Sequence, residues 1–465
     1  MKKIICILLF VFPVVAFAQQ PWYKYSPMNY AWKNVGNADF SAGDAFFTKI
    51  AFNPLDGLPY VAYMDEANFN KATVTKFDGN NWVNIGNAGF SADWINFISL
   101  AFSPSGEPYV AFEDWTTNPS GKATVMKFDG NNWLIVGTAG FSEGQAEYIN
   151  IAFSPSGEPF VAYEDYVNSN KATTMEFDGT NWVNVGNVGF SAGLVLDLSL
   201  AFSPVDGHPY LAYYDDGNSG KATVMTFNGT NWMDVGNAGF STSYTIYESL
   251  AFSASGQPYV VYSDYAYAYK ATLMKFDGTN WINVGNAGFS AGEADYTSLA
   301  FSPSGEPYVA FMDYATIPFG KTTLMKFDGT NWVNVGNAGF SEGTAAWTSL
   351  AFSPNGEPYI AFQDNVDSNR ATVMKYDSVM VGINNLKKSK LSVYPNPATD
   401  KITIETSPTP TKSQLSILNL TGQELISQQV SGRKTVTVIN SLPSGVYFVR
   451  VTNDRTVTVG KIIKQ

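Results

Sequence analysis

Cysteine and histidine are almost absent from this chain of 465 residues. The only cysteine, Cys6, lies close to the N-terminus, and the only histidine is His208. These absences exclude Cys-His catalysis, any multi-histidine metal site and, beyond the first residues, disulfide bonds and thiol chemistry. They also argue against Ser-His-Asp catalysis, because His208 is the one histidine. We expect no metal and no cofactor, because the acidic stretch Asp215–Asn218 lacks the alternating ligands and final glutamate of an ordered calcium loop.

Residues 1–18 have the features of an export signal. Lys2 and Lys3 supply a positive start, an apolar run covers 4–15, and Ala16-Phe17-Ala18 is a small-x-small cleavage site. We therefore predict a signal peptide at 1–18 and a mature chain that begins at Gln19. An uncleaved membrane anchor is the alternative, but the run is short for a bilayer span. No later segment predicts a transmembrane anchor.

Basic residues are scarce in the central part of the chain. The whole chain carries a formal net charge of −12. The segment from Leu386 onward is the exception, with eleven Lys/Arg against four Asp/Glu. An acidic body repels phosphate backbones and anionic membranes at short range. Nucleic acid is therefore not expected as a partner.

A tryptophan recurs along the chain at spacings of 49 to 51 residues. Between successive copies, four short β-rich segments alternate with turns rich in Gly, Pro and Asp-Gly, and no apolar spacing of the helical kind occurs. The content of 40 Gly and 23 Pro agrees with many turns. The seven copies are Trp32, Trp82, Trp133, Trp182, Trp232, Trp281 and Trp332.

Each repeat predicts one four-stranded sheet, and seven sheets arranged radially bury each face against a neighbour. We therefore predict an all-β fold in which 19–385 form a seven-bladed β-propeller. Trp32 stands before the first complete repeat, whereas the last repeat ends at Asp377 without its fourth strand. We expect the N-terminal strand to supply that strand and close the ring. An open β-solenoid, the alternative, gains nothing from this offset.

Residues 386–465 form a second region, in which the repeat ends and short β-rich segments alternate with turn signals. A small immunoglobulin-like β-sandwich fits this length. Four ordered motifs occur there: Tyr394-Pro395-Asn396-Pro397, Asn419-Leu420-Thr421-Gly422-Gln423, Leu442-Pro443-Ser444-Gly445-Val446-Tyr447 and the closing Lys461-Ile462-Ile463-Lys464-Gln465.

Together these motifs closely resemble the type A C-terminal sorting domain of the Bacteroidetes type IX secretion system. The resemblance implies that the secretion machinery is a partner and that the chain is exported to the cell exterior. There it would be released or attached to the outer surface. An ordinary accessory sandwich is the alternative.

Sequence variation concentrates in two loops of each repeat, those that connect strand four to the next repeat and strand two to strand three. In an antiparallel blade both loops lie on one face of the ring, where binding loops are expected. An aromatic residue stands near the start of the first strand in six repeats: Phe47, Phe97, Tyr148, Tyr247, Tyr296 and Trp347. Asp197 occupies the seventh position, and Trp94 and Tyr244 stand nearby. Aromatic rings stack on sugars or on peptide side chains, so a ligand-binding ring is one interpretation. Packing between adjacent blades is the other, and the sequence favours it.

An acid and a base recur at the second hairpin of every repeat. The acids that end strand two are Asp65, Asp114, Asp165, Asp215, Asp264, Asp313 and Asp364, and the bases that begin strand three are Lys71, Lys122, Lys171, Lys221, Lys270, Lys321 and Arg370. Cross-strand ion pairs, or carboxylates that accept loop amides, are the expected structural roles. A functional ring of carboxylates is the alternative.

The sequence favours a secreted or cell-surface binding protein with a glycan or protein ligand. A polysaccharide-acting enzyme stays open, because Glu143, Glu147, Glu293, Asp295 and Glu342 lie in the variable loops. Catalysis needs an acid and a base in different environments, however, and near-identical repeats offer similar ones. A purely structural surface protein is the third possibility.

Overall fold

The computed structural model describes residues 29–116, 121–315, 320–366, 368–379, 390–407, 413–420, 422–430, 432–452 and 457–465. The chain separates into two compact units, one formed by Tyr30–Ser378 and another that contains Val379–Gln465. The predicted signal peptide, 1–18, lies outside the described residues. Among the residues described, no helix is long and apolar enough to cross a membrane.

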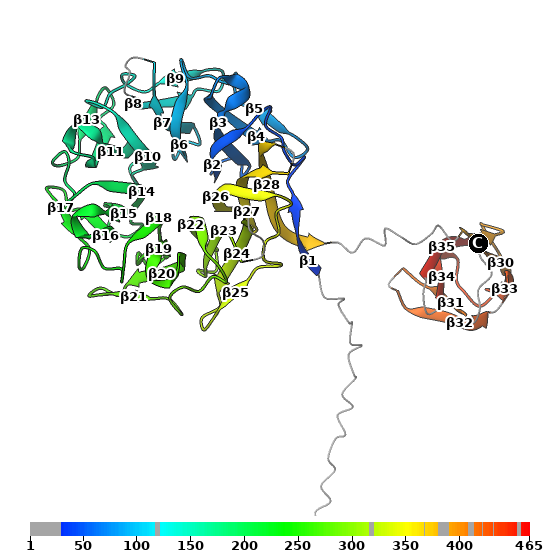
Figure 1. Cartoon of the computed structure of the whole chain (residues 1–465). Coiled ribbons are helices and arrows are strands. Elements are labelled where there is room, and N and C mark those ends of the chain that lie inside the picture. The colour runs from blue at the N-terminus through cyan, green and yellow to red at the C-terminus, as the bar shows by residue number, and fades with distance from the viewer. Residues whose placement is uncertain are drawn as a thin grey trace, which may run out of the picture. The chain divides into compact units, whose positions relative to one another are not determined.

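The repeats form four-stranded antiparallel sheets arranged around a ring, which confirms the predicted all-β propeller (Figure 1). The first, innermost strands are β2 (Ala45–Phe52), β6 (Ile95–Phe102), β10 (Ala146–Phe153), β14 (Val195–Phe202), β18 (Thr245–Phe252), β22 (Ala294–Phe301) and β26 (Thr344–Phe352). The second strands are β3 (Pro59–Asp65), β7 (Pro108–Asp114), β11 (Pro159–Asp165), β15 (Pro209–Asp215), β19 (Pro258–Asp264), β23 (Pro307–Asp313) and β27 (Pro358–Asn365).

The fourth strands of the first six blades are short, with three residues each. The third strands are β4 (Lys71–Phe77), β8 (Lys122–Phe128), β12 (Lys171–Phe177), β16 (Lys221–Phe227), β20 (Lys270–Phe276), β24 (Lys321–Phe327) and β28 (Asn369–Val379). The fourth strands are β5 (Trp82–Asn84), β9 (Trp133–Ile135), β13 (Trp182–Asn184), β17 (Trp232–Asp234), β21 (Trp281–Asn283) and β25 (Trp332–Asn334). Single 3₁₀ turns follow strand two in four blades: η1 (Glu66–Asn68), η2 (Tyr166–Asn168), η3 (Asp216–Asn218) and η4 (Tyr265–Tyr267).

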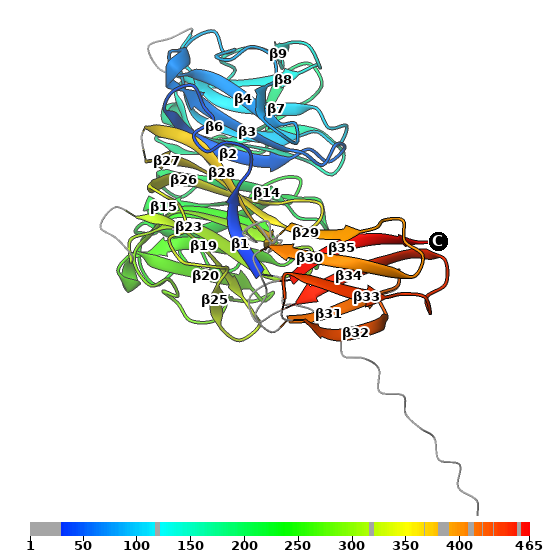
Figure 2. The same ribbon diagram turned by 90° about the vertical axis from the view of Figure 1, so that its right-hand side faces the viewer.

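The seventh sheet joins the two ends of the repeat region. Its strand order is β1 (Asn29–Asn34), β28, β27, β26, so the N-terminal strand occupies the outer position that the last repeat leaves open. The first blade also contacts the seventh, since the amide of Ile50 donates to Ser349 Oγ at 3.1 Å. Figure 2 shows β2 and β26 beside each other in the side view.

The core of the repeat unit lies between blades rather than within them. Val61 and Tyr63 of β3, for example, share a cluster with Tyr359 and Ala361 of β27. Both faces of strand two are covered, and every residue of β3 is buried. This explains the continuous Val/Ala/aromatic run of that strand, because a strand covered on both faces has no polar face to alternate with.

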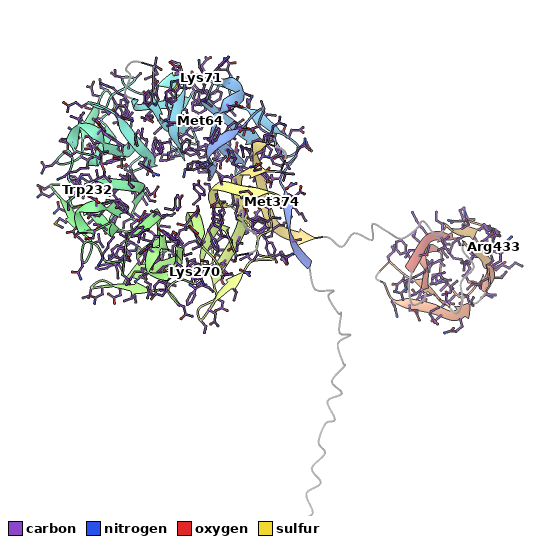
Figure 3. The ribbon with its side chains drawn as sticks, in the orientation of Figure 1. Met64, Lys71, Trp232, Lys270, Met374 and Arg433 are labelled. Carbon is purple, nitrogen blue, oxygen red and sulfur yellow. The ribbon has the colours of Figure 1, made fainter. Side chains whose placement is uncertain are left out.

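The recurrent tryptophan ties each blade to the one before it. Trp232 Nε1 donates to the carbonyl of Val185 at 2.8 Å, and its ring stacks on Phe190 at 4.3 Å between centroids. Trp32 makes the same contacts, with the carbonyl of Val335 at 2.9 Å and the ring of Phe340 at 3.7 Å. Figure 3 shows Trp232 on the outer part of its blade.

The strand register places the variable loops on one face of the ring. Ala45 pairs with Asp65, so the start of strand one lies beside the end of strand two. At the other end of the blade Phe52 pairs with Pro59, and Phe77 pairs with Trp82, which brings the uniform turns together. The loops from strand four to the next blade and from strand two to strand three therefore share one face of the ring, which we call the variable face.

The tail folds as two β-sheets around its own core. One sheet has the order β29 (Lys390–Tyr394), β30 (Lys401–Ser407), β33 (Lys434–Val438). The other has the order β32 (Glu424–Val430), β31 (Ser413–Leu418), β34 (Gly445–Thr452), β35 (Val457–Lys464). Ile402 of the first sheet and Leu415 and Ile462 of the second are fully buried in one cluster. The predicted C-terminal β domain is confirmed.

Candidate functional site

The aromatic positions of the inner strands share an unusual backbone conformation. The register shifts by a β-bulge at this place in every blade, for example between Phe46 and Lys49. The residues at the bulge all have positive φ, between 48° and 60°: Phe47, Phe97, Tyr148, Asp197, Tyr247, Tyr296 and Trp347. Bulky residues rarely adopt this left-handed backbone conformation, because it is sterically unfavourable for them. The bulge turns these side chains toward the axis of the ring.

These seven residues line a cavity of about 560 Å³ at the centre of the inner strands. The rings also pack on one another around the axis, with centroids 4.3 Å apart for Phe47 and Trp347 and 4.7 Å apart for Tyr296 and Trp347. The six rings form an arc that Asp197 interrupts. They therefore serve as contacts between blades and as the wall of the cavity at once.

Polar residues two places after the bulge link neighbouring inner strands. Ser249 Oγ, for example, accepts the amide of Leu299 in the next blade at 3.1 Å. Six blades supply such an acceptor: Ser99, Asn150, Ser199, Ser249, Ser298 and Ser349. Lys49 occupies this position in the first blade, and an ammonium group accepts no hydrogen bond. The sevenfold pattern is broken there.

Three ionisable side chains of the cavity wall depart from the repeat: Lys49, Asp197 and Glu248. Asp197 Oδ2 accepts the amide of Tyr247 at 2.8 Å. Glu248 is 6% exposed, and its Oε1 accepts the hydroxyl of Thr245. Its Oε2 is buried without a hydrogen-bond partner in the described structure. In three other blades this position holds a threonine, such as Thr48, whose hydroxyl donates to the carbonyl of Trp347 at 2.7 Å.

The charges of this group act on one another within the cavity. The Lys49 side chain is exposed within the cavity, where the charge of the Asp197 carboxylate favours the charged form of its ammonium group. Burial raises the pKa of Asp197, against the amide of Tyr247 and the charge of Lys49. Burial, followed by the nearby Asp197, raises the pKa of Glu248 well above its ordinary value. The two carboxyl groups are thus shifted toward their neutral forms.

The recurrent aspartates at the end of strand two bind the hairpin that follows them. Asp215 Oδ2 accepts the hydroxyl of Thr223 at 2.9 Å and the side-chain amide of Asn218 at 2.7 Å, and its Oδ1 accepts the amide of Gly217. Asp65 faces Lys71 in the register, yet Lys71 Nζ donates to the carbonyl of Ala92 instead. In the part of the chain that the structure describes, these aspartates form no ion pair with the facing bases.

Two acids that sequence reasoning missed lie on the variable side of blades two and three. Burial raises the pKa of Glu113 and of Glu164 to about 7. Glu147, one of the acids that the sequence placed in a variable loop, pairs with Glu164 in the register of β10 and β11. Gln145 Nε2 donates a hydrogen bond to both Glu147 and Glu113. The signal was present in the sequence, since the equivalent positions hold Met64, Tyr214, Ser263, Met312 and Gln363.

The other acids of the predicted loop set do not join that cluster. Burial, reinforced by the charge of Glu293, raises the pKa of Asp295 to about 6. Glu342 acts on Asp364, whose pKa is about 6, mainly because it is buried. Glu143 lies near Tyr163, in the third blade.

Further aromatic side chains are exposed on the variable loops. Trp94 stacks on Trp115 with centroids 4.3 Å apart, and Tyr244 stacks on Tyr265 at the same distance. Neither Trp94 nor Tyr244 is among the residues that line the cavity. Sequence reasoning missed Phe69, which is 83% exposed just after η1.

The sorting motifs lie at turns and strand ends of the tail. The Tyr394–Pro395 and Asn396–Pro397 peptide bonds are cis. The side chain of Asn396 binds β35 twice, donating to the carbonyl of Lys461 and accepting the amide of Ile463. Tyr447 donates to the carbonyl of Pro443 at 2.8 Å. Gly422 takes a φ of +81° in its turn, and Gly445 begins β34.

The fold is that of a repeat propeller with a separate β domain at its C-terminus. Residues 392–465 match the family described as secretion system C-terminal sorting domain. The chain therefore carries the sorting tail of the type IX secretion system, which indicates export to the extracellular space or the cell surface.

Solved structures similar to this chain include other propeller proteins. PorZ, an essential surface component of the type IX secretion system of Porphyromonas gingivalis, has 14% identity and a TM-score of 0.40, over 90% of this chain and 70% of PorZ. An ulvan lyase has 11% identity and a TM-score of 0.49, over 74% of this chain and 95% of its own. A Trypanosoma rangeli sialidase has 9% identity and a TM-score of 0.41, over 93% and 89%. No curated protein matched the chain.

Proposed function

We propose that this protein is an exported binding protein whose ligand, a glycan or a protein segment, enters the central cavity from the variable face. The observation that carries the proposal is the cavity itself. It joins an aromatic wall to two polar groups that a ligand can reach: the exposed Lys49, which makes no hydrogen bond among the described residues, and Glu248 Oε2, which is buried without a partner there. Specific ligand pockets combine an apolar lining with a few convergent polar groups in this way.

The test is binding of the full secreted chain to a glycan array and to proteins of the extracellular medium. The matched variants are Trp347→Ala, Tyr296→Ala and Tyr148→Ala, each of which removes one ring from the cavity wall. Tyr166→Ala is the control, because this exposed ring lies on the variable face outside the cavity. We expect the three cavity variants to weaken binding and the control to bind normally. Binding that survives all three changes would refute the proposal.

A polysaccharide-acting enzyme is the second candidate, favoured by the cluster of Glu113, Glu147 and Glu164. Two of these acids have a pKa of about 7, which suits a proton donor at neutral pH. Release of reducing sugar from a polysaccharide panel, abolished by Glu164→Gln, would support this function over binding alone. A chain that neither binds nor cleaves any probe would fit the purely structural role.

A further inference from the structure

The inner strands repeat one design around the ring, and three ionisable residues replace it at single places. Where the other blades have a small acceptor, the first blade has Lys49. Where six blades have an aromatic ring, the fourth has Asp197, and where three blades have a threonine, the fifth has Glu248. All three side chains line the same cavity. Departures from three different blades thus converge on one space.

Each replacement removes a contact that the repeat supplies elsewhere. Lys49 gives the amide of Leu100 no acceptor equivalent to the serine that serves Leu299. Glu248 stands where the other blades have either a threonine whose hydroxyl donates to the preceding blade or a buried Ile or Leu, and it leaves Oε2 without a partner in the described structure. Asp197 interrupts the aromatic arc. Burial of the Glu248 carboxyl group without full pairing also costs free energy. The scaffold alone gives no reason for these three residues.

The polar atoms left over define what would satisfy them. Among the described residues the Lys49 ammonium makes no hydrogen bond, and Asp197 is the charged group that acts on it. Glu248 offers one unused oxygen. An occupant must therefore accept hydrogen bonds from Lys49 and donate hydrogen bonds to the carboxyl groups, within a cavity whose wall is otherwise aromatic.

We propose that Lys49, Asp197 and Glu248 form the polar part of a binding site for a neutral, hydroxyl-rich carbohydrate unit in the central cavity. This inference rests on the proposed binding function and specifies its ligand. Six aromatic rings supply apolar contact for the C–H faces of the sugar. Because seven inner strands surround the cavity, the carbohydrate enters through its mouth, either as a free oligosaccharide or as the end of a polymer.

A neutral ligand fits this site better than a charged one. Burial shifts the two carboxyl groups toward their neutral forms, and Lys49 already faces the opposite charge of Asp197, which weakens any site that needs a full ion pair with its ligand. A hydroxyl group both donates and accepts, so it can serve a carboxylate, a protonated carboxyl or an ammonium group. A carboxylated sugar or a free amino acid would instead require fixed charges on both sides.

The decisive variants restore the repeat. Lys49→Ser introduces the residue of the neighbouring blades, and Glu248→Thr introduces the threonine found at Thr48, Thr297 and Thr348. Asp197→Asn removes the charge while keeping the shape and the hydrogen bond from Tyr247. Lys122→Ser is the control, because it removes a lysine from the variable face outside the cavity.

Calorimetry on the full chain with neutral gluco-, xylo-, manno- and galacto-oligosaccharides is the measurement. At least one series should bind, and each cavity variant should weaken it by about tenfold or more, whereas Lys122→Ser should not. Lys49→Ser and Glu248→Thr should melt at the same temperature as the parent chain or higher. Melting below the parent would mean that these residues stabilise the scaffold, which overturns the proposal. Competition between an oligosaccharide and its polymer separates free units from chain ends.

The failures of the two proposals are distinguishable. If only uronic-acid or sialic-acid glycans bind, or only a protein ligand that Trp347→Ala weakens, then the neutral-carbohydrate site is wrong and the binding function stands. Unchanged affinity in all three charged-residue variants has the same meaning. If no probe binds at all, both proposals fail.

Discussion

Removal of the recurrent tryptophan should loosen the joint between two blades by a predictable amount. Trp232 is 8% exposed, stacks on Phe190 and donates to the carbonyl of Val185. A buried indole removes roughly 150–250 Å² from water, worth about 4–6 kcal/mol at 25 cal/mol per Å², of which alanine retains a part. Loss of the hydrogen bond adds about 1 kcal/mol. We therefore expect Trp232→Ala to lower the free energy of unfolding by about 4 kcal/mol.

The same change at Trp32 tests the joint between the chain ends. Trp32 repeats the contacts of Trp232, but β1 is separated along the chain from the three strands it joins. Trp32 is only half-buried, so we expect Trp32→Ala to cost about 3 kcal/mol. The Trp32→Phe variant keeps a stacking ring and loses only the hydrogen bond, which predicts a cost of about 1 kcal/mol.

Urea unfolding followed by tryptophan fluorescence is the assay. All 11 tryptophans precede the tail, so the signal reports on the repeat unit within the full chain. Trp94→Ala is the control, because this ring is 37% exposed and should cost less than about 1 kcal/mol. If Trp232→Ala lowers the urea midpoint and Trp32→Ala leaves it unchanged, then β1 does not contribute to the stability of the ring. That result would refute the reasoning.

Two further changes address buried carboxyl groups. The pKa of Glu113 is about 7 in the folded chain against an ordinary 4.5, so its contribution to stability is complete below pH 4.5, falls as the pH rises toward 7 and stays low above it. Glu113→Gln should remove a loss of about 3 kcal/mol between these limits, measured as the urea midpoint at pH 4.5 and pH 8; an unchanged pH slope would contradict the burial of this acid. Asp215→Ala removes three hydrogen bonds and should cost about 2–4 kcal/mol by the same assay, and a cost below about 0.5 kcal/mol would show that the hairpin does not depend on them.

The architecture could be predicted from the sequence because it depends on periodic features. The tryptophan spacing, the Asp-Gly turns and the strand lengths recur in every blade, and Trp32 precedes the first complete repeat. These features can be recognised from local residue patterns and from the number of repeats. The position of β1 in the seventh sheet followed from that count.

The details of the site depended on geometry that no spacing reveals. The bulge that gives Phe47 and its equivalents a positive φ has no residue signature, because bulky aromatic side chains rarely adopt that conformation. The acid and base of the second hairpin are neighbours in register, yet Asp65 binds Thr73 at 2.9 Å while the longer Lys71 reaches a loop carbonyl. A buried carboxylate is satisfied by nearby neutral donors as well as by a lysine, and the choice depends on side-chain direction.

Near-identical repeats make single departures informative. If the ring were only a scaffold, drift would place substitutions where they cost least, on exposed loops and turns. Lys49, Asp197 and Glu248 instead lie on three separate inner strands, at positions where the repeat already offers a residue that completes a contact between blades. Functional sites are the places where proteins retain such unfavourable groups at the expense of stability. Stability and binding should therefore respond in opposite directions: restoring the repeat should stabilise the ring and weaken ligand binding, and a loss of both would indicate a structural role for these residues.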